Sequence, residues 1–184
     1  MKRSTMVAVV VALAVLACWS PAAKARTGFT DEGNMSLSIG GGLSSNVFSI
    51  GGSFGYFIRD NLMPGICYFY VHESRDKPVS HTVDSNQLNL FLRYYIVDLG
   101  GLIPFVTGDV GYENRSQSGA DIVDQSFNLY NVMGGGGIVF FVGSNFAIEA
   151  TLGMRKYVSV PKALEDGDFD DQKLEYYIGF GIYL

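Results

Sequence analysis

Residues 173–184 read KLEYYIGFGIYL, a run in which every second side chain is large and apolar. The alternate positions carry charged, small or hydroxylated residues. Because a β-strand sends successive side chains to opposite faces, one face of this strand is apolar and the other is polar or small. A soluble sandwich would bury the apolar face and leave glycines facing water, whereas an outer-membrane barrel turns apolar residues to lipid. The run therefore predicts a membrane-spanning β-strand.

The beginning of the chain has the features of a secretory signal peptide. Residues 1–3 are Met-Lys-Arg, residues 6–17 are apolar or small, and residues 23–25 form an Ala-Lys-Ala cleavage site. The apolar run is too short to cross a membrane as a helix. We therefore expect residues 1–25 to be cleaved as a signal peptide and residues 26–184 to form one barrel domain. An alternative is lipoprotein processing at Cys18, because residues 15–18 resemble a lipobox.

Composition narrows the class of protein further. Removing Lys2, Arg3 and Lys24 with the leader leaves ten basic residues against eighteen acidic ones, so nucleic acid is not an expected partner. Cys67 is the only cysteine left, which excludes an intramolecular disulfide. All eleven tyrosines and thirteen phenylalanines stay in the mature chain, a density that suits the aromatic girdles of a membrane barrel.

Alternation predicts eight strands in the mature chain. The expected strands are residues 35–43, 48–56, 62–71, 87–96, 104–113, 127–141, 146–155 and 174–184. The third strand is apolar on both sides, so alternation leaves open which of its sides faces the lumen. Eight tilted strands of about ten residues close an antiparallel barrel with both termini on one side. Long polar loops are expected outside the cell at residues 72–84, 114–125 and 157–171, with short turns in the periplasm.

Four phrases in these strands resemble a known family. They are residues 55–62 (GYFIRDNL), 92–95 (LRYY), 104–106 (PFV) and 145–150 (NFAIEA). The chain resembles the outer-membrane β-barrel domain family, which includes the small OmpA/OmpX-type eight-stranded barrels. The resemblance implies a location in the outer membrane of a Gram-negative-type bacterium, in a porin-like family. Family members commonly end in a phenylalanine read by the barrel-assembly machinery, whereas this chain ends in Leu184.

The last strand is still expected to carry the C-terminal assembly signal. Its alternating apolar ending is formed by Phe180, Ile182 and Leu184. We therefore expect the barrel-assembly machinery to bind this strand, with reduced efficiency because the final aromatic ring is missing.

Strand parity places seven charged residues on inward faces. They are Arg93, Asp109, Glu113, Glu149, Arg155, Lys173 and Glu175. An eight-stranded barrel is just wide enough for side chains to fill it, and unpaired charges there would be costly to desolvate. We expect a polar lumen network that plugs and orders the barrel. The functional alternative is a gate for a small ion-conducting channel.

The remaining candidates for chemistry lie outside the lumen. His72 and His81, with Glu73, Ser74 and Ser80 nearby, leave open a lipid A-modifying enzyme, although loop proximity supplies no catalytic geometry. The acidic run at residues 165–171 offers oxygens to calcium but lacks EF-hand spacing. The glycine runs at residues 40–42 and 134–137 indicate close approach within strands, because no phosphate-loop motif follows them.

These observations predict a non-enzymatic outer-membrane protein with no catalytic residues, cofactor or metal. Its expected work is envelope integrity or an adhesion-like surface interaction through the external loops. The expected partners are outer-membrane lipids and lipopolysaccharide, the assembly machinery, and an extracellular or host surface ligand. We expect a monomer.

Overall fold

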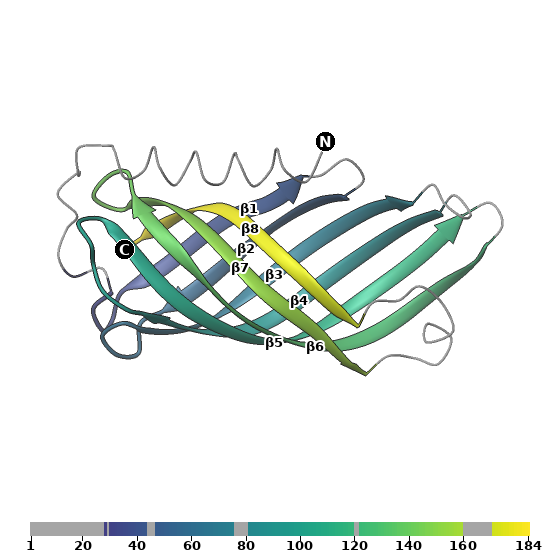
Figure 1. The fold of residues 1–184 in the computed structure, drawn as a ribbon, viewed down its shortest axis with the longest axis horizontal. Helices are drawn as coiled ribbons and strands as arrows, with labels where there is room; N and C mark the ends of the chain where they lie inside the picture. Colours follow the sequence, from purple (N-terminus) through teal and green to yellow (C-terminus); the bar gives the residue numbers. More distant parts are fainter. Residues whose placement is uncertain (1–27, 29, 44–46, 76–80, 120–121, 160–170) are drawn as a thin grey trace.

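The computed structural model describes residues 28, 30–43, 47–75, 81–119, 122–159 and 171–184. The predicted leader, including Cys18, lies outside these ranges. Eight strands form a closed barrel in chain order, and each strand is antiparallel to both neighbours (Figure 1). The strands are β1 (Met35–Leu43), β2 (Val47–Tyr56), β3 (Leu62–Arg75), β4 (His81–Tyr95), β5 (Leu102–Gly119), β6 (Ile122–Phe141), β7 (Phe146–Ser159) and β8 (Gln172–Tyr183). The predicted eight-stranded up-and-down barrel is confirmed.

The first and last strands meet to close the barrel. The β1–β8 ladder runs from Ser36 opposite Tyr183 to Gly41 opposite Ile178. At its end Met35 and Leu184 exchange two backbone hydrogen bonds of 2.9 Å. This end also holds the short β2–β3, β4–β5 and β6–β7 turns, and is called the short-turn end below; the opposite end is the hairpin end (Figure 1).

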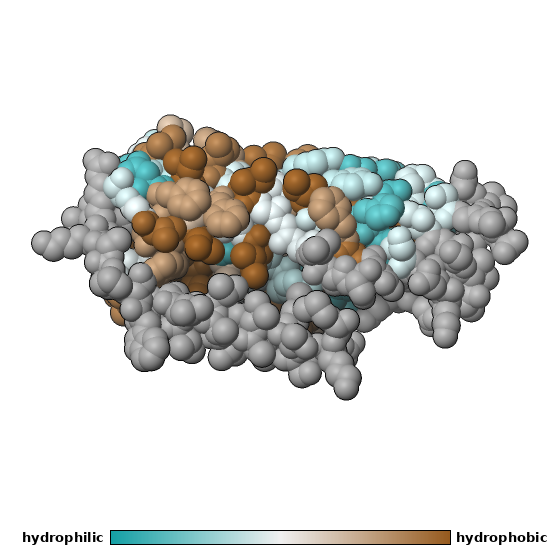
Figure 2. Space-filling model, turned by 90° about the horizontal axis from the view of Figure 1, so that it is seen from above, coloured by the Kyte–Doolittle hydropathy of each residue, from teal (hydrophilic) through white to brown (hydrophobic). Residues whose placement is uncertain are grey.

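The outer surface of the barrel carries a belt of exposed apolar side chains. Leu37, Leu90 and Leu174 are 57%, 61% and 65% exposed, although each lies within a strand. Apolar side chains gather towards the short-turn end, and hydrophilic ones towards the hairpin end (Figure 2). Among the described residues, no helix is long and apolar enough to cross a membrane.

The exposed side chains show how the third strand faces and where the C-terminal apolar residues lie. The third strand, β3, turns Ile66 and Tyr68 outward, while Cys67 between them is buried. The three apolar residues proposed as the assembly signal, Phe180, Ile182 and Leu184, are all exposed at the C-terminal end of the chain.

Two of the three long loops predicted from the sequence are largely wrong, and residues 160–170 of the third lie outside the described residues. Residues 72–75 extend β3, residues 81–84 open β4, and their ladder continues to Arg75 opposite His81. Strands β5 and β6 likewise stay paired up to Gly119 opposite Ile122, and β7 reaches Ser159. Beyond the apolar belt the outward side chains of these hairpins are polar, while inward ones such as Val83 and Arg115 stay buried, so the apolar alternation disappears while the backbone ladder persists. The hairpin end is therefore a raised rim of paired strands.

Glycines let aromatic rings lie flat against the inner wall. Phe91 stands opposite Gly65 in the β3–β4 ladder, and a Cβ on that glycine would strike its ring. Phe105 covers Gly137 of β6 in the same way, which fulfils the expected close approach in the run at residues 134–137. These rings fill space that the small residues leave open.

Candidate functional site

The lumen at the short-turn end is filled by apolar and aromatic side chains. Neighbouring rings lie close, with centroids 5.3 Å apart for Phe57 and Tyr95 and 5.1 Å apart for Phe141 and Tyr183. The members of this aromatic plug are Phe57, Met63, Tyr95, Ile103, Phe105, Val139, Phe141, Ala147 and Tyr183, all buried. Because packed rings leave no room for water, this end of the barrel is closed.

A buried ion pair lies against the aromatic plug. Arg93 of β4 donates to Glu149 of β7 at 2.8 Å, and the Glu149 side chain has no solvent exposure. Tyr183 donates a second hydrogen bond to this carboxylate at 3.1 Å. The Arg93 guanidinium lies over the Phe105 ring, 4.7 Å from its centroid. Strands far apart in the sequence are thus joined across the lumen, with the remaining carboxylate oxygen also hydrogen-bonded.

A second ion-pair cluster lies nearer the hairpin end and is centred on Arg155 of β7. Its Nε donates to Glu175 at 2.8 Å, and its Nη1 donates to Asp109 at 3.1 Å and also to Asn131. A single guanidinium therefore holds groups from β5, β6 and β8. This bridging uses the fixed fork of donors that arginine provides.

A third cluster surrounds the buried carboxylate of Glu113. It accepts hydrogen bonds from Arg115 at 2.9 Å, Tyr157 at 2.7 Å and Gln87 at 2.9 Å. The sequence analysis missed Arg115, because the expected strand ended at Glu113. Continuing the same inward parity by one step would have found it.

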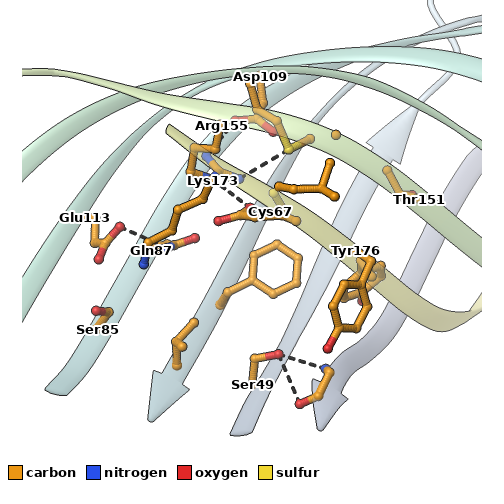
Figure 3. Close-up of a pocket in the computed structure, with 18 of the residues that line it drawn as sticks. Ser49, Cys67, Ser85, Gln87, Asp109, Glu113, Thr151, Arg155, Lys173 and Tyr176 are labelled. Carbon is orange, nitrogen blue, oxygen red and sulfur yellow. Dashed lines mark hydrogen bonds and ion pairs between the residues drawn. The ribbon is translucent and has the colours of Figure 1, made fainter. Parts of the chain in front are cut away.

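A cavity of about 420 Å³ lies among these clusters (Figure 3). The free thiol of Cys67 is buried at its wall. The Thr151 hydroxyl and the Tyr177 hydroxyl also belong to lining residues, and neither has a hydrogen-bond partner among the described residues. The lumen thus has a packed short-turn end and a hollow, polar section towards the hairpin end.

The seven predicted lumen residues all lie inside the barrel, and the structure connects six of them. Arg93 contacts Glu149, Arg155 contacts both Asp109 and Glu175, and Glu113 contacts Arg115, which had not been predicted. Lys173 lines the cavity, and no ion pair within 4.0 Å joins it to another described residue. The network is therefore three separate clusters and one lysine.

The histidines do not form the loop cluster that the sequence suggested. His72 lies in β3, where its Nδ1 is 2.8 Å from the Asp84 carboxylate, which also accepts a hydrogen bond from Tyr70. His81 opens β4, and Ser80 lies outside the described residues. The described part of the chain holds no group of three metal-ligating side chains. Residues 165–170 of the acidic run are outside the described ranges.

A closed antiparallel barrel with an apolar outer belt and a charged interior defines an outer-membrane β-barrel protein. Residues 42–182 match the family model described as the OprF membrane domain. The chain belongs to the OprF membrane domain family, which confirms the recognised resemblance and places the protein among outer-membrane barrels.

Solved structures show the same fold at low sequence identity. The N-terminal β-barrel domain of Pseudomonas aeruginosa OprF is 19% identical, with a TM-score of 0.54, covering 83% of this chain and 98% of that one. Ail, the attachment invasion locus protein of Yersinia pestis, is 15% identical, with a TM-score of 0.55 and coverages of 83% and 99%. A major outer membrane protein from Thermus thermophilus is 11% identical, with a TM-score of 0.61 and coverages of 82% and 99%. No curated protein matches the chain.

Proposed function

We propose that this protein is a non-enzymatic outer-membrane protein that supports envelope integrity or surface interaction and does not conduct ions through its lumen. The observation that carries the proposal is the aromatic plug with the Arg93–Glu149 pair beside it. A solute entering from the hairpin end would have to displace close-packed rings and separate a buried ion pair. We place the short-turn end in the periplasm, as the loop rule for such barrels expects.

Planar-bilayer recording tests the closed lumen. The purified barrel is expected to give no steady conductance at moderate voltage. Two variants of β7 are compared in this recording. Ala147→Gly removes a side chain from the plug and loosens it, whereas Ala150→Gly is the control, because the Ala150 side chain lies on the outward parity of the same strand. Steady ion flux through the unaltered protein would favour the small-channel alternative and overturn the plugged lumen.

The raised rim is the part of the barrel available to an external partner. Its β3–β4 and β5–β6 hairpins extend the sheet by paired backbone, so they present fixed side chains to the outside. The contacts first assigned to loops at residues 72–84, 114–125 and 157–171 thus fall partly on these strands. A deletion strain complemented with the full protein or with shortened hairpins separates the two roles. Envelope integrity requires only the barrel, whereas surface attachment requires the hairpins.

Absence of enzymatic activity is part of this proposal. Expression is expected to leave the mass spectrum of lipid A unchanged, because no serine or cysteine among the described residues hydrogen-bonds to the His72–Asp84 pair, as acyl transfer by a nucleophile and base would require. A lipid A mass shift that disappears in His72→Ala or His81→Ala would establish the lipid-modifying alternative instead.

We propose outer-membrane lipids and lipopolysaccharide as partners of the apolar belt, and the assembly machinery as the partner of the exposed residues of the C-terminal strand. Leu184→Phe is expected to speed assembly, measured as the fraction of heat-modifiable protein after a pulse of synthesis. We propose a monomer with a cleaved leader, which native mass spectrometry in detergent would test.

A further inference from the structure

The barrel wall changes at the seam between β1 and β8. Their ladder ends at Gly41 opposite Ile178, whereas β8 begins six residues earlier at Gln172. Strand β1 continues to Leu43, and there it pairs only with β2. Among the described residues, the first half of β8 therefore has β7 as its one strand neighbour. The pairs from Ser36 to Gly41 close the barrel, and the stretch beyond them, where described β1 and β8 residues no longer pair, is called the seam below.

The backbone at the seam is satisfied without β8. The Gly42 N–H donates to the Ser49 hydroxyl at 2.7 Å, and that hydroxyl lies 3.3 Å from the Gly42 carbonyl oxygen (Figure 3). An unpaired peptide group facing hydrocarbon would cost several kcal/mol. Because Ser49 supplies this partner from β2, β1 can part from β8 at this level without an orphaned N–H.

Two hollows lie beside the seam and share Ser49 as a lining residue. The lumen cavity is lined there by Gly42 and also by Leu174 and Tyr176, whose side chains lie on the outward parity of β8. A Cβ on Gly42 would stand 3.2 Å from the Ser49 hydroxyl and 3.8 Å from the Tyr176 ring, and the space between this glycine and the ring is called the throat below. A second hollow of about 260 Å³ lies on the outer surface, with Ser49 in its wall as well. Its lining is Ile39, Gly40, Gly41, Phe48, Ser49, Ile50 and Phe180.

The two hollows differ in chemistry. The outer one is lined by four apolar side chains, two glycines and Ser49, whereas the inner one has Lys173 among its lining residues. Lys173 is half-buried and is the one lysine or arginine lining the cavity that has no ion pair among the described residues. Four carboxylates line the same cavity: those of Asp109, Glu113 and Glu175 are each engaged by an arginine, and that of Glu73 is the nearest in effect to Lys173, which it attracts. The buried hydroxyls of Thr151 and Tyr177 supply further polar contacts.

We propose that the β1–β8 seam is a lateral binding site for a single-chain anionic lipid. The acyl chain lies in the outer hollow over Gly41, and the anionic head group passes Gly42 and Ser49 to reach Lys173. We place the site at the hairpin-end edge of the apolar belt, beside the exposed side chains of Leu174 and Tyr176, and with the hairpin end outside the cell this edge meets the outer-leaflet head groups. This inference goes beyond the proposed function and does not require a conducting lumen.

The test uses a photoreactive palmitate analogue in vesicles containing the refolded barrel, with peptide mapping of the cross-links. Labelling is expected to concentrate on residues of the two hollows. Lys173→Met should lower it about tenfold, the size of one charge-assisted contact. Lys156→Met is the matched control, because this lysine lies on neighbouring β7 but is exposed on the outside, and it should leave labelling unchanged. The methyl ester of the probe, which lacks the charge, should label the outer hollow but not the cavity wall.

A second variant tests the throat independently of charge. A leucine at Gly42 would contact the Ser49 hydroxyl and the Tyr176 ring and obstruct the passage. Gly42→Leu should abolish labelling of the cavity wall, while Gly134→Leu, at a position with nothing within 4 Å of a new Cβ, should not. Heat-modifiable gel migration verifies that each variant is folded. A photoreactive lysophosphatidylglycerol distinguishes a phosphate from a carboxylate head group. Uniform labelling around the belt, or labelling insensitive to both Lys173→Met and Gly42→Leu, would overturn the proposal.

Discussion

The two ends of the lumen surround buried charge differently. At the short-turn end Arg93 borders the cavity, whereas its partner Glu149 lies against close-packed aromatic rings and outside the cavity lining. The Glu149 and Glu113 side chains are both fully buried, so exposure does not distinguish them. Towards the hairpin end the Arg155 and Glu113 clusters border a cavity of about 420 Å³. Both ends use arginine and carboxylate, so the composition of the ion pairs does not distinguish them.

The two ends differ in what can solvate a carboxylate after its arginine partner is removed. A carboxylate next to a polar cavity can be hydrated when its arginine is removed, whereas one enclosed by packed rings cannot. The short-turn end is therefore expected to behave as a rigid closure and the cavity section as a tolerant interior. Substitutions of the same chemical kind at the two ends measure this contrast.

The largest effect is expected for Arg93→Met. It leaves Glu149 charged and buried without its partner, so the free energy of unfolding should fall by about 3–5 kcal/mol. Heat-modifiable gel migration and urea unfolding in lipid vesicles measure the loss. The double variant with Glu149→Met should recover most of it, because no unpaired charge remains. An unaltered transition in the single variant would remove Arg93 from the closure.

Arg155→Met is the matched change in the cavity section. It removes contacts to Asp109 and Glu175, but both carboxylates line the cavity and can take up water. The expected loss is about 1–3 kcal/mol by the same urea titration. A loss equal to that of Arg93→Met would show that the two ends are equally enclosed, and the comparison would fail.

Tyr183→Phe removes one hydroxyl group of the closure while keeping the ring in the plug. The hydroxyl donates to Glu149 at 3.1 Å and lies 3.2 Å from the Tyr95 hydroxyl. Its removal should cost about 1 kcal/mol in urea unfolding. Tyr130→Phe, on the lipid-facing surface and 55% exposed, serves as the control and should change the midpoint very little. Equal effects would indicate that the Tyr183 hydroxyl does not support Glu149.

The smallest effect is expected outside the lumen, for His72→Ala. The His72 and Asp84 side chains are 42% and 38% exposed, so solvent screens their pairing. The unfolding free energy should fall by less than about 1 kcal/mol. Repeating the titration at high salt should bring the variant and the unaltered protein together. A loss comparable with Arg155→Met would place this outer pair among the structural contacts of the barrel.

Much of the candidate site could be predicted from strand parity, and the rest could not. Parity placed Arg93 and Glu149 inside the barrel because inward and outward positions alternate by two. Parity did not identify Arg115, because the predicted strand stopped at Glu113, where the outward residues are no longer apolar. The same cause turned paired hairpins into predicted loops: outside the membrane, alternation no longer reports on backbone pairing.

The sequence alone determined the class of protein, the number of strands and which side chains face inward, because a membrane imposes a two-residue period on any strand that crosses it. Only the tertiary structure decided the partners, since these depend on strand stagger and on which walls face each other across the lumen. It joined Arg93 to Glu149 across the barrel, gave Arg155 two carboxylates and left Lys173 beside the seam. Local alternation carries no information about stagger, so neither the pairs nor the cavity between them could be read from the chain.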